Sequence, residues 1–166
     1  MSAQLRRGLG GANTANTAVE RWLSEANMWL KEFYAEHTRS PRQSLNKVFA
    51  AWKALVAALA QLASELDPGL REELRRRGFI EDGVVKVTTA TAPRIIHLVA
   101  EKAGQEPVRE LARSLLGLRK DAYILHTAFY EGPEHAGFTG TEEALETATR
   151  LAEKLREVAE QLHYLV

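Results

Sequence analysis

Apolar residues recur at helical spacing through most of the chain. One face of residues 15–33 is apolar, and residues 45–66 are rich in alanine and leucine around most of a helix circumference. Apolar positions three and four residues apart indicate a helix with one buried face, whereas an apolar circumference indicates burial on several sides. The pattern predicts two long helices, separated near Ser40 because Pro41 disfavours helical backbone at the residue before it. Ser44 is the predicted N-cap of the second helix.

Proline and glycine divide the second half of the chain into further helices. Asp67 is a predicted N-cap because it precedes a proline, which suits the first position of a helix. Gly117 is expected to bend a longer helix, and Thr139 or Thr141 is expected to cap the last one. These signals predict helices over residues 68–77, 93–103, 107–131 and 141–165.

The segment from Phe79 to Ala92 lacks helical periodicity. Its sequence, FIEDGVVKVTTATA, places the turn pair Asp82-Gly83 between β-branched residues. An Asp-Gly pair between such residues is a hairpin signal, although an isolated two-stranded hairpin is only marginally stable. We therefore expect extended or irregular backbone here, as a loop or small ribbon on a helical body.

The predicted elements define an all-α fold, an antiparallel helical bundle with four main helices and one or two short ones. Helices with one apolar stripe bury it by packing against one another. The 166 residues are enough for one domain, which we place at residues 14–166 after a disordered leader over residues 1–13. The core is expected to include three tryptophans, namely Trp22, Trp29 and Trp52.

Composition narrows the functional classes. The formal net charge is zero, which argues against strong non-specific binding to nucleic acid or anionic membrane. Cysteine is absent, so disulfides and thiol chemistry are excluded, and the histidines lack metal-ligand spacing. We expect no metal and no cofactor. No span approaches about 20 uninterrupted apolar residues and no signal peptide is recognisable, which predicts a cytoplasmic protein outside the membrane.

One helical segment, LRKDAYILHTAFYEG, carries the candidate chemistry. Residues seven apart on a helix differ by about 20° around the axis, so Arg119 and His126 are expected to project together, with Tyr123 and Tyr130 in the same stripe. A histidine can transfer a proton near neutral pH, and an arginine can hold a phosphate. The pair would suffice for metal-free RNA cleavage, or simply for binding a nucleotide. Alternatively, Arg119 extends to solvent and His126 is a half-buried structural residue.

This segment resembles the HEPN superfamily, whose hallmark is an arginine and a histidine near the start of a late helix. Arg119 with six intervening residues before His126 fits the long end of the family's spacing, and Lys120 or Asp121 fills the polar position after the arginine. The stretch LNKVFAAWKALVAALA is similar to the second HEPN helix. AYILHTAFYEG, with the loop and terminal helix after it, is similar to the archaeal PaREP branch.

The resemblance implies a helical bundle that forms a homodimer and brings two Arg-His motifs together. It implies Arg119 and His126 as catalytic residues, with substrate binding by Asp121, Tyr123 and Tyr130. RNA or a nucleotide would be the ligand, and a nucleotidyltransferase-type protein would be a partner. Some toxin members carry a tyrosine two residues after the histidine, where this chain has Ala128.

Two functions stay open at this point. One is a metal-independent ribonuclease or nucleotide-binding module, and the other is a non-catalytic helical module for protein interaction or dimerisation. A homodimer is expected in either case, because the second helix is apolar almost all round. The run REELRRRG, from Arg71 to Gly78, is the one basic cluster in the sequence. It is typical of a solvated helix end, where positive charge complements the helix dipole.

Overall fold

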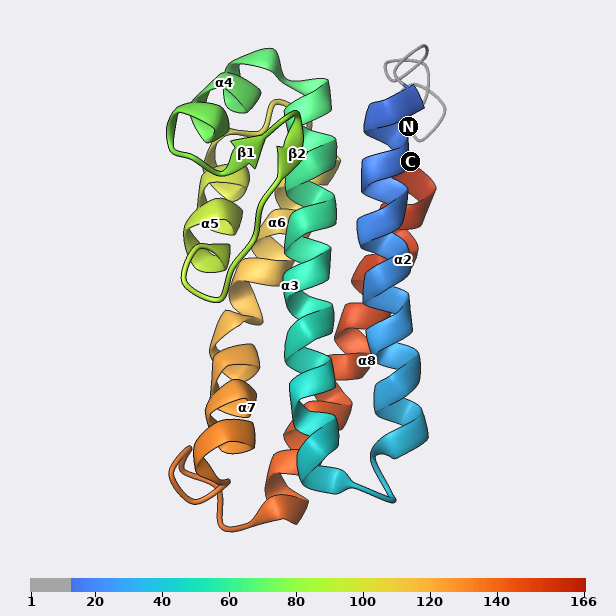
Figure 1. Cartoon of the computed structure of the whole chain (residues 1–166), viewed down its shortest axis with the longest axis vertical. Coiled ribbons are helices and arrows are strands. Elements are labelled where there is room, and N and C mark those ends of the chain that lie inside the picture. The colour runs from blue at the N-terminus through green and yellow to red at the C-terminus, as the bar shows by residue number, and fades with distance from the viewer. Residues whose placement is uncertain (1–12) are drawn as a thin grey trace.

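The computed structural model describes residues 13–166 and confirms an all-α bundle. Three long helices run along the molecule, and shorter helices stack beside them (Figure 1). The leader predicted for residues 1–13 lies outside the described residues, except for Asn13, at which the first described helix begins. The helices are α2 (Asn13–Glu36), α3 (Pro41–Leu66), α4 (Pro68–Arg76), α5 (Ala92–Lys102), α6 (Glu106–Gly117), α7 (Arg119–Glu131) and α8 (Thr141–Leu165).

Helix α3 is the central element of the core. It packs against α2, α5, α7 and α8, and most of its residues are buried, which confirms the prediction from its apolar circumference. By length and composition α3 could cross a membrane, but 83% of its most apolar window is buried inside the bundle. The apolar circumference of α3 was the reason to expect a dimer interface, but the other helices of the same chain already cover it. The homodimer stays a prediction, without support from α3.

The start of α3 differs from the prediction at its cap. The helix begins at Pro41 with Ser40 as N-cap residue, whereas Ser44 lies one turn inside the helix. The Ser44 hydroxyl is buried and donates a hydrogen bond to the Pro41 carbonyl, at 2.6 Å. Ser44 as N-cap was therefore wrong. Proline at the first helical position starts the helix earlier than the serine would have done.

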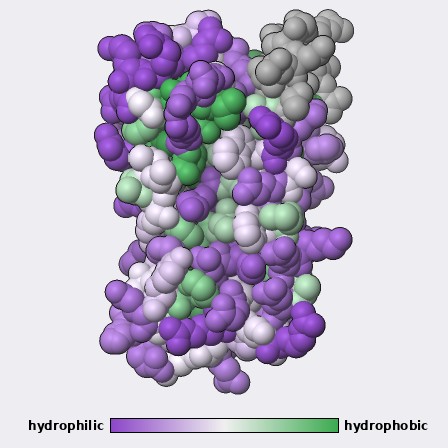
Figure 2. Space-filling view, in the orientation of Figure 1, coloured by the Kyte–Doolittle hydropathy of each residue, from purple (hydrophilic) through white to green (hydrophobic). Residues whose placement is uncertain are grey.

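The predicted hairpin forms between α4 and α5. Strands β1 (Ile80–Glu81) and β2 (Val84–Val85) pair antiparallel around Asp82 and Gly83, which both have positive φ angles of 53° and 77°. Those angles are typical of the tight hairpin turn that Asp-Gly favours. Figure 2 shows polar residues over most of this face of the molecule and its largest hydrophobic area over the hairpin.

A buried glutamine of α3 fastens the hairpin to the bundle. The Gln61 side chain accepts a hydrogen bond from the Val85 amide at 2.8 Å and donates to the Gly83 carbonyl at 3.0 Å. The same amide nitrogen donates to Glu65 at 2.9 Å. A two-stranded hairpin is marginal alone, so these bonds account for its position. The second carboxylate oxygen of Glu65 is buried and has no hydrogen-bond partner among the described residues.

Replacing Glu65 by glutamine should stabilise the protein at pH 7. Burial raises the pKa of Glu65, while the bond from Gln61 and the charge of Arg71 lower it. A carboxyl with a raised folded pKa stabilises the fold below its unfolded pKa, and that stability is lost as pH rises through the folded pKa. We expect the Tm of Glu65→Gln to be about 1–2 °C higher at pH 7, a small effect because Glu65 is only partly buried and the bond from Gln61 offsets part of the cost of burial. Thermal unfolding at pH 4 should show the difference disappearing, and an equal gain at both pH values would contradict this explanation.

The helix predicted over residues 107–131 is broken in two. Helix α6 ends at Gly117, and α7 begins at Arg119 after Leu118. Glycine is a poor helix former, and the buried indole of Trp52 donates a hydrogen bond to the Leu115 carbonyl at 2.9 Å. The Trp52 indole therefore binds a carbonyl group at the end of α6. Where the sequence predicted a bend in one helix, the structure has two separate helices.

The cap of α8 also differs from the prediction. Gly140 occupies the N-cap position, and neither Thr139 nor Thr141 caps the helix with its side chain. Instead, the Glu143 carboxylate reaches back to accept hydrogen bonds from the Thr139 amide and hydroxyl, at 3.2 and 2.6 Å. In a capping box a glutamate at the third helical position accepts from the N-cap amide, whereas Glu143 binds the residue before the N-cap and so holds the entering loop. Among the described residues, no side chain caps the first amides of α8.

The three tryptophans are not equally buried. Trp52 is fully buried in the core, as predicted. Trp22 and Trp29 on α2 are only half-buried and pack against the edge of the core. The expectation that all three lie inside was wrong for these two, because α2 is an outer helix whose main neighbour is α3.

Candidate functional site

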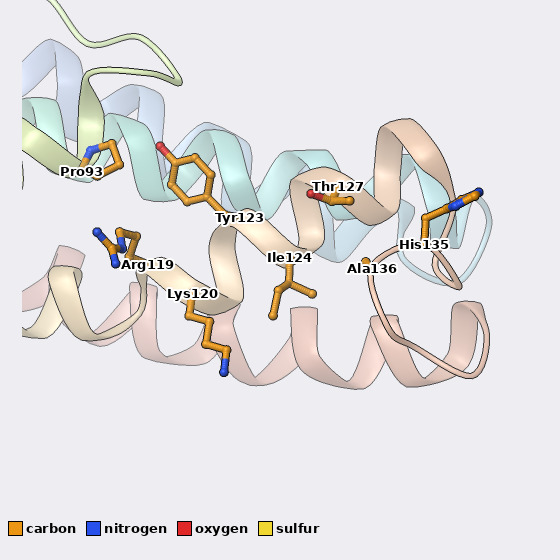
Figure 3. A pocket seen from close by; sticks show the side chains of 8 residues that line it. All are labelled: Pro93, Arg119, Lys120, Tyr123, Ile124, Thr127, His135 and Ala136. Atoms are coloured by element: carbon orange, nitrogen blue, oxygen red, sulfur yellow. The ribbon is translucent and has the colours of Figure 1, made fainter.

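A groove of about 630 Å³ runs along the outer side of α7. Figure 3 shows Arg119, Lys120 and Tyr123 at one end with Pro93 beside them, and the loop that carries His135 at the other end. This volume is within the roughly 300–1,000 Å³ usual for small-molecule sites. The remaining lining residues are Ile124, Thr127 and Ala136.

Two adjacent cations stand at the entrance of the groove. Arg119 and Lys120 are the first two residues of α7, and both are exposed. Within residues 18–166 neither of them forms an ion pair, although several other lysines and arginines do. An arginine can bind phosphate or carboxylate at two points, and a lysine adds a mobile point charge. The entrance is therefore suited to an anionic group.

Tyr123 forms the wall between the groove and the core. Its ring lies edge-on to Phe49 and Trp52, with centroid distances of 5.2 and 5.5 Å. Its hydroxyl donates a hydrogen bond to the Thr89 carbonyl in the loop after the hairpin. Burial raises the pKa of Tyr123 to about 12, and the charge of Arg119 opposes the increase. The phenol stays protonated at neutral pH and can keep donating to Thr89.

His126 lies against α3 rather than in the groove. Its ring stacks on Phe49 with a centroid distance of 4.3 Å, and Tyr130 contacts it edge-on at 4.8 Å. Its Nδ1 atom is buried and has no hydrogen-bond partner among the described residues. Burial lowers the pKa of His126, and the nearby positive charge of Lys53 lowers it further. The imidazole is thus held neutral, as expected of a packed ring.

The other predicted site residues take separate positions. Tyr130 is 63% exposed, one turn beyond the groove-lining Thr127. Asp121 is half-buried and is not among the groove residues. The structure thus brings Arg119 and Tyr123 together, whereas His126 and Tyr130 form a second group with Phe49. Both groups meet at Phe49, which contacts Tyr123 on one side and His126 on the other.

Several groove residues gave no signal in the sequence. Pro93 comes from α5, far along the chain from α7, and His135 comes from the loop after α7, whose path back to the groove depends on the fold. Ile124 and Thr127 lie outside the Arg-His stripe. A helical wheel could have placed Ile124 and Thr127 beside Lys120, but it could not show that this side of α7 is left open.

Half of the basic cluster on α4 is paired with glutamates. Arg75 pairs with Glu72, and Glu73 binds both Arg77 and Lys102, at 2.9 and 2.8 Å. The bond to Arg75 is the main reason that the pKa of Glu72 is lowered, and the bond to Lys102 is the main reason that the pKa of Glu73 is lowered. The exposure of the arginine side chains fits the expected solvated helix end.

Comparisons with protein-family models, with curated proteins and with solved structures found no match to this chain.

Proposed function

We propose that this protein binds RNA or a nucleotide in the α7 groove, with Arg119 and Lys120 holding phosphate. The observation that carries the proposal is the pair of adjacent cations, free of ion pairs within the described part of the chain, beside an aromatic wall. Phosphate binding by arginine and lysine and base contact with an aromatic ring are the usual components of such sites.

Two further points support this class of ligand. The groove has room for a nucleotide, and its wall is mainly apolar between the polar ends at Arg119 and His135. The resemblance of the segment from Arg119 to Glu131 to HEPN proteins is a separate argument for RNA or a nucleotide. Because the net charge is zero, the attraction must come from this local pair rather than from the whole surface.

Binding is better supported than cleavage. A general acid or base must lie within hydrogen-bond reach of the proton that it transfers. His126 does not line the groove in which Arg119 stands, and its Nδ1 atom is buried. The proposed activity of one chain is therefore binding, with Arg119 as a phosphate ligand and without His126 as an acid-base group.

Single alanine variants of the two cations test the proposal. Arg119→Ala and Lys120→Ala should each weaken binding of fluorescein-labelled hexauridylate about 10-fold, because each removes a charged hydrogen bond to phosphate. The slope of log affinity against log salt should also fall in magnitude by about one per variant. Fluorescence anisotropy at several salt concentrations measures both quantities.

Matched controls lie on α2. Arg21 and Lys31 are exposed and far along the chain from the groove. Arg21→Ala and Lys31→Ala should leave the hexauridylate affinity within about twofold of the parent chain. If the groove and control variants weakened binding equally, hexauridylate would be held by non-specific charge attraction rather than in the groove, which would contradict the proposal.

A further inference from the structure

The most exposed large apolar side chain described, Tyr130, has no role in the groove itself. Its ring is 63% exposed, and it contacts His126 and Phe129 edge-on, with centroid distances of 4.8 and 4.7 Å. A single exposed tyrosine is ordinary on a protein surface, so the position of Tyr130 along α7, rather than its exposure alone, carries the argument. The underlying rings also restrict the orientation of Tyr130. Tyr130 is therefore held by two neighbouring rings, while most of its surface is exposed to solvent.

Tyr130 continues the line of the groove. Arg119, Tyr123, Thr127 and Tyr130 follow each other at intervals of three or four residues along α7. Such residues share one side of a helix, and Tyr130 is about 20° from both Arg119 and Tyr123 around the axis. The axial distance from Arg119 to Tyr130 is about 16 Å at a rise of 1.5 Å per residue. That is the length of roughly four to five stacked bases at about 3.4 Å each.

Two more cations lie beside this line, Arg42 near its outer end and Lys53 near its middle, beside His126. Arg42 donates two hydrogen bonds, at 3.2 and 3.1 Å, to the carbonyl of Phe129, the residue before Tyr130. Lys53 lies 5.4 Å from the centroid of Phe49, the ring on which His126 stacks. Neither Arg42 nor Lys53 is in an ion pair within residues 18–166.

We infer that the ligand is a single-stranded polynucleotide of several residues, and that one of its bases stacks on Tyr130 after the strand leaves the groove. This inference rests on the proposed function and extends it from a nucleotide to a strand. Single-stranded sites combine a cationic track with aromatic rings that stack on successive bases. Here Arg119 and Lys120 form one end of the track, Lys53 lies near its middle, and Arg42 lies near the other end.

A comparison of short and long probes tests the inference. The unaltered protein should bind hexauridylate at least about 10-fold more tightly than it binds uridine monophosphate, because only the longer probe reaches Tyr130. Tyr130→Ala should weaken hexauridylate binding about 10-fold, the effect of losing one stacked base, and should leave monophosphate binding within twofold. Tyr130→Phe should bind both probes as the unaltered protein does.

Tyr164→Ala is the matched control, because Tyr164 near the end of α8 is 59% exposed. It should change neither affinity. Hexathymidylate, in parallel, distinguishes a general single-stranded site from one that requires ribose. Circular dichroism should show all three variants folded, since both tyrosines are largely exposed.

The outcomes separate the two claims. If hexauridylate and the monophosphate bind equally well, or if Tyr130→Ala matches Tyr164→Ala, the strand inference is overturned while nucleotide binding stands. If the unaltered protein binds neither probe, the proposed function fails and the strand inference fails with it.

Discussion

Trp52→Ala should lower the free energy of unfolding by about 3–5 kcal/mol, the usual cost of removing a buried tryptophan. Trp52 has no exposed surface, and its indole is hydrogen-bonded to the Leu115 carbonyl at the end of α6. The variant would lose packing against Phe49 and Tyr123 together with that bond. Urea unfolding followed by far-ultraviolet circular dichroism measures the change.

Trp52→Phe separates the hydrogen bond from the packing. Phenylalanine is smaller and cannot donate to Leu115, whose carbonyl keeps, within the described chain, only the bond from the Leu118 amide at 3.2 Å, so we expect a loss of about 1–3 kcal/mol from the lost bond and the smaller ring together. The matched control is Trp22→Phe on α2, where the tryptophan is half-buried. It should cost less than 1 kcal/mol. Equal losses in the two phenylalanine variants would show that the bond to Leu115 contributes nothing.

His126→Ala should lower the free energy of unfolding by about 2 kcal/mol and leave the affinity for uridine monophosphate unchanged, because His126 does not line the groove. The alanine removes the ring that stacks on Phe49, and a half-buried ring costs less than the 3–5 kcal/mol of a fully buried one. His97→Ala is the control, because His97 is exposed and pairs only with Glu101. It should change stability by less than about 0.5 kcal/mol.

His126→Phe provides a second test. It preserves the stack on Phe49 and removes the buried Nδ1 atom that lacks a partner, so we expect it to be at least as stable as the parent chain. RNA cleavage that persists in EDTA and falls about 10²-fold in His126→Phe would contradict this account. Such a result would assign His126 to catalysis. Because His126 and Arg119 do not share a groove within one chain, the result would point to a site formed by more than one chain.

The lowered pKa of His126 should make the free energy of unfolding decrease as pH falls. Burial and the charge of Lys53 lower the pKa of His126 in the folded state, whereas the unfolded chain binds a proton near the ordinary value of about 6.5. As pH falls below about 6.5, the unfolded state takes up the proton first and stability is lost. The loss levels off once pH passes the lowered folded pKa. His126→Phe should remove this loss of stability as pH falls below about 6.5.

Much of the fold could be predicted because helix patterns are local. The apolar spacing gave the long helices, and Asp67 caps α4 as its place before proline indicated, accepting a bond from the Leu70 amide at 3.1 Å. The break at Leu118 was underestimated because it depends on Trp52, which lies 63 residues before Leu115 in the chain. A local pattern contains no information about such a contact.

The site was predictable only in part for a similar reason. The spacing of seven residues placed Arg119 and His126 on one side of a helix. The packing of the neighbouring helices decides which residues on that side are covered and which stay open. Phe49 of α3 covers His126, whereas Arg119, at the first turn, lies beyond it and lines the groove. The two residues are about 10 Å apart along the helix axis, so a ring of the neighbouring helix can cover one of them and leave the other open.

The interruption at Leu118 has a consequence for how the molecule unfolds. A continuous helix would couple its two halves through one ladder of hydrogen bonds, so that both would open together. Here α6 packs mainly on α5, while α7 depends on α3 and α8 and meets α6 only near their junction. Proteins open locally in units with separate stabilities. Helix α7 and the loop after it can therefore open as their own unit while α5 and α6 stay closed. All of the groove's lining residues except Pro93 belong to the unit that opens.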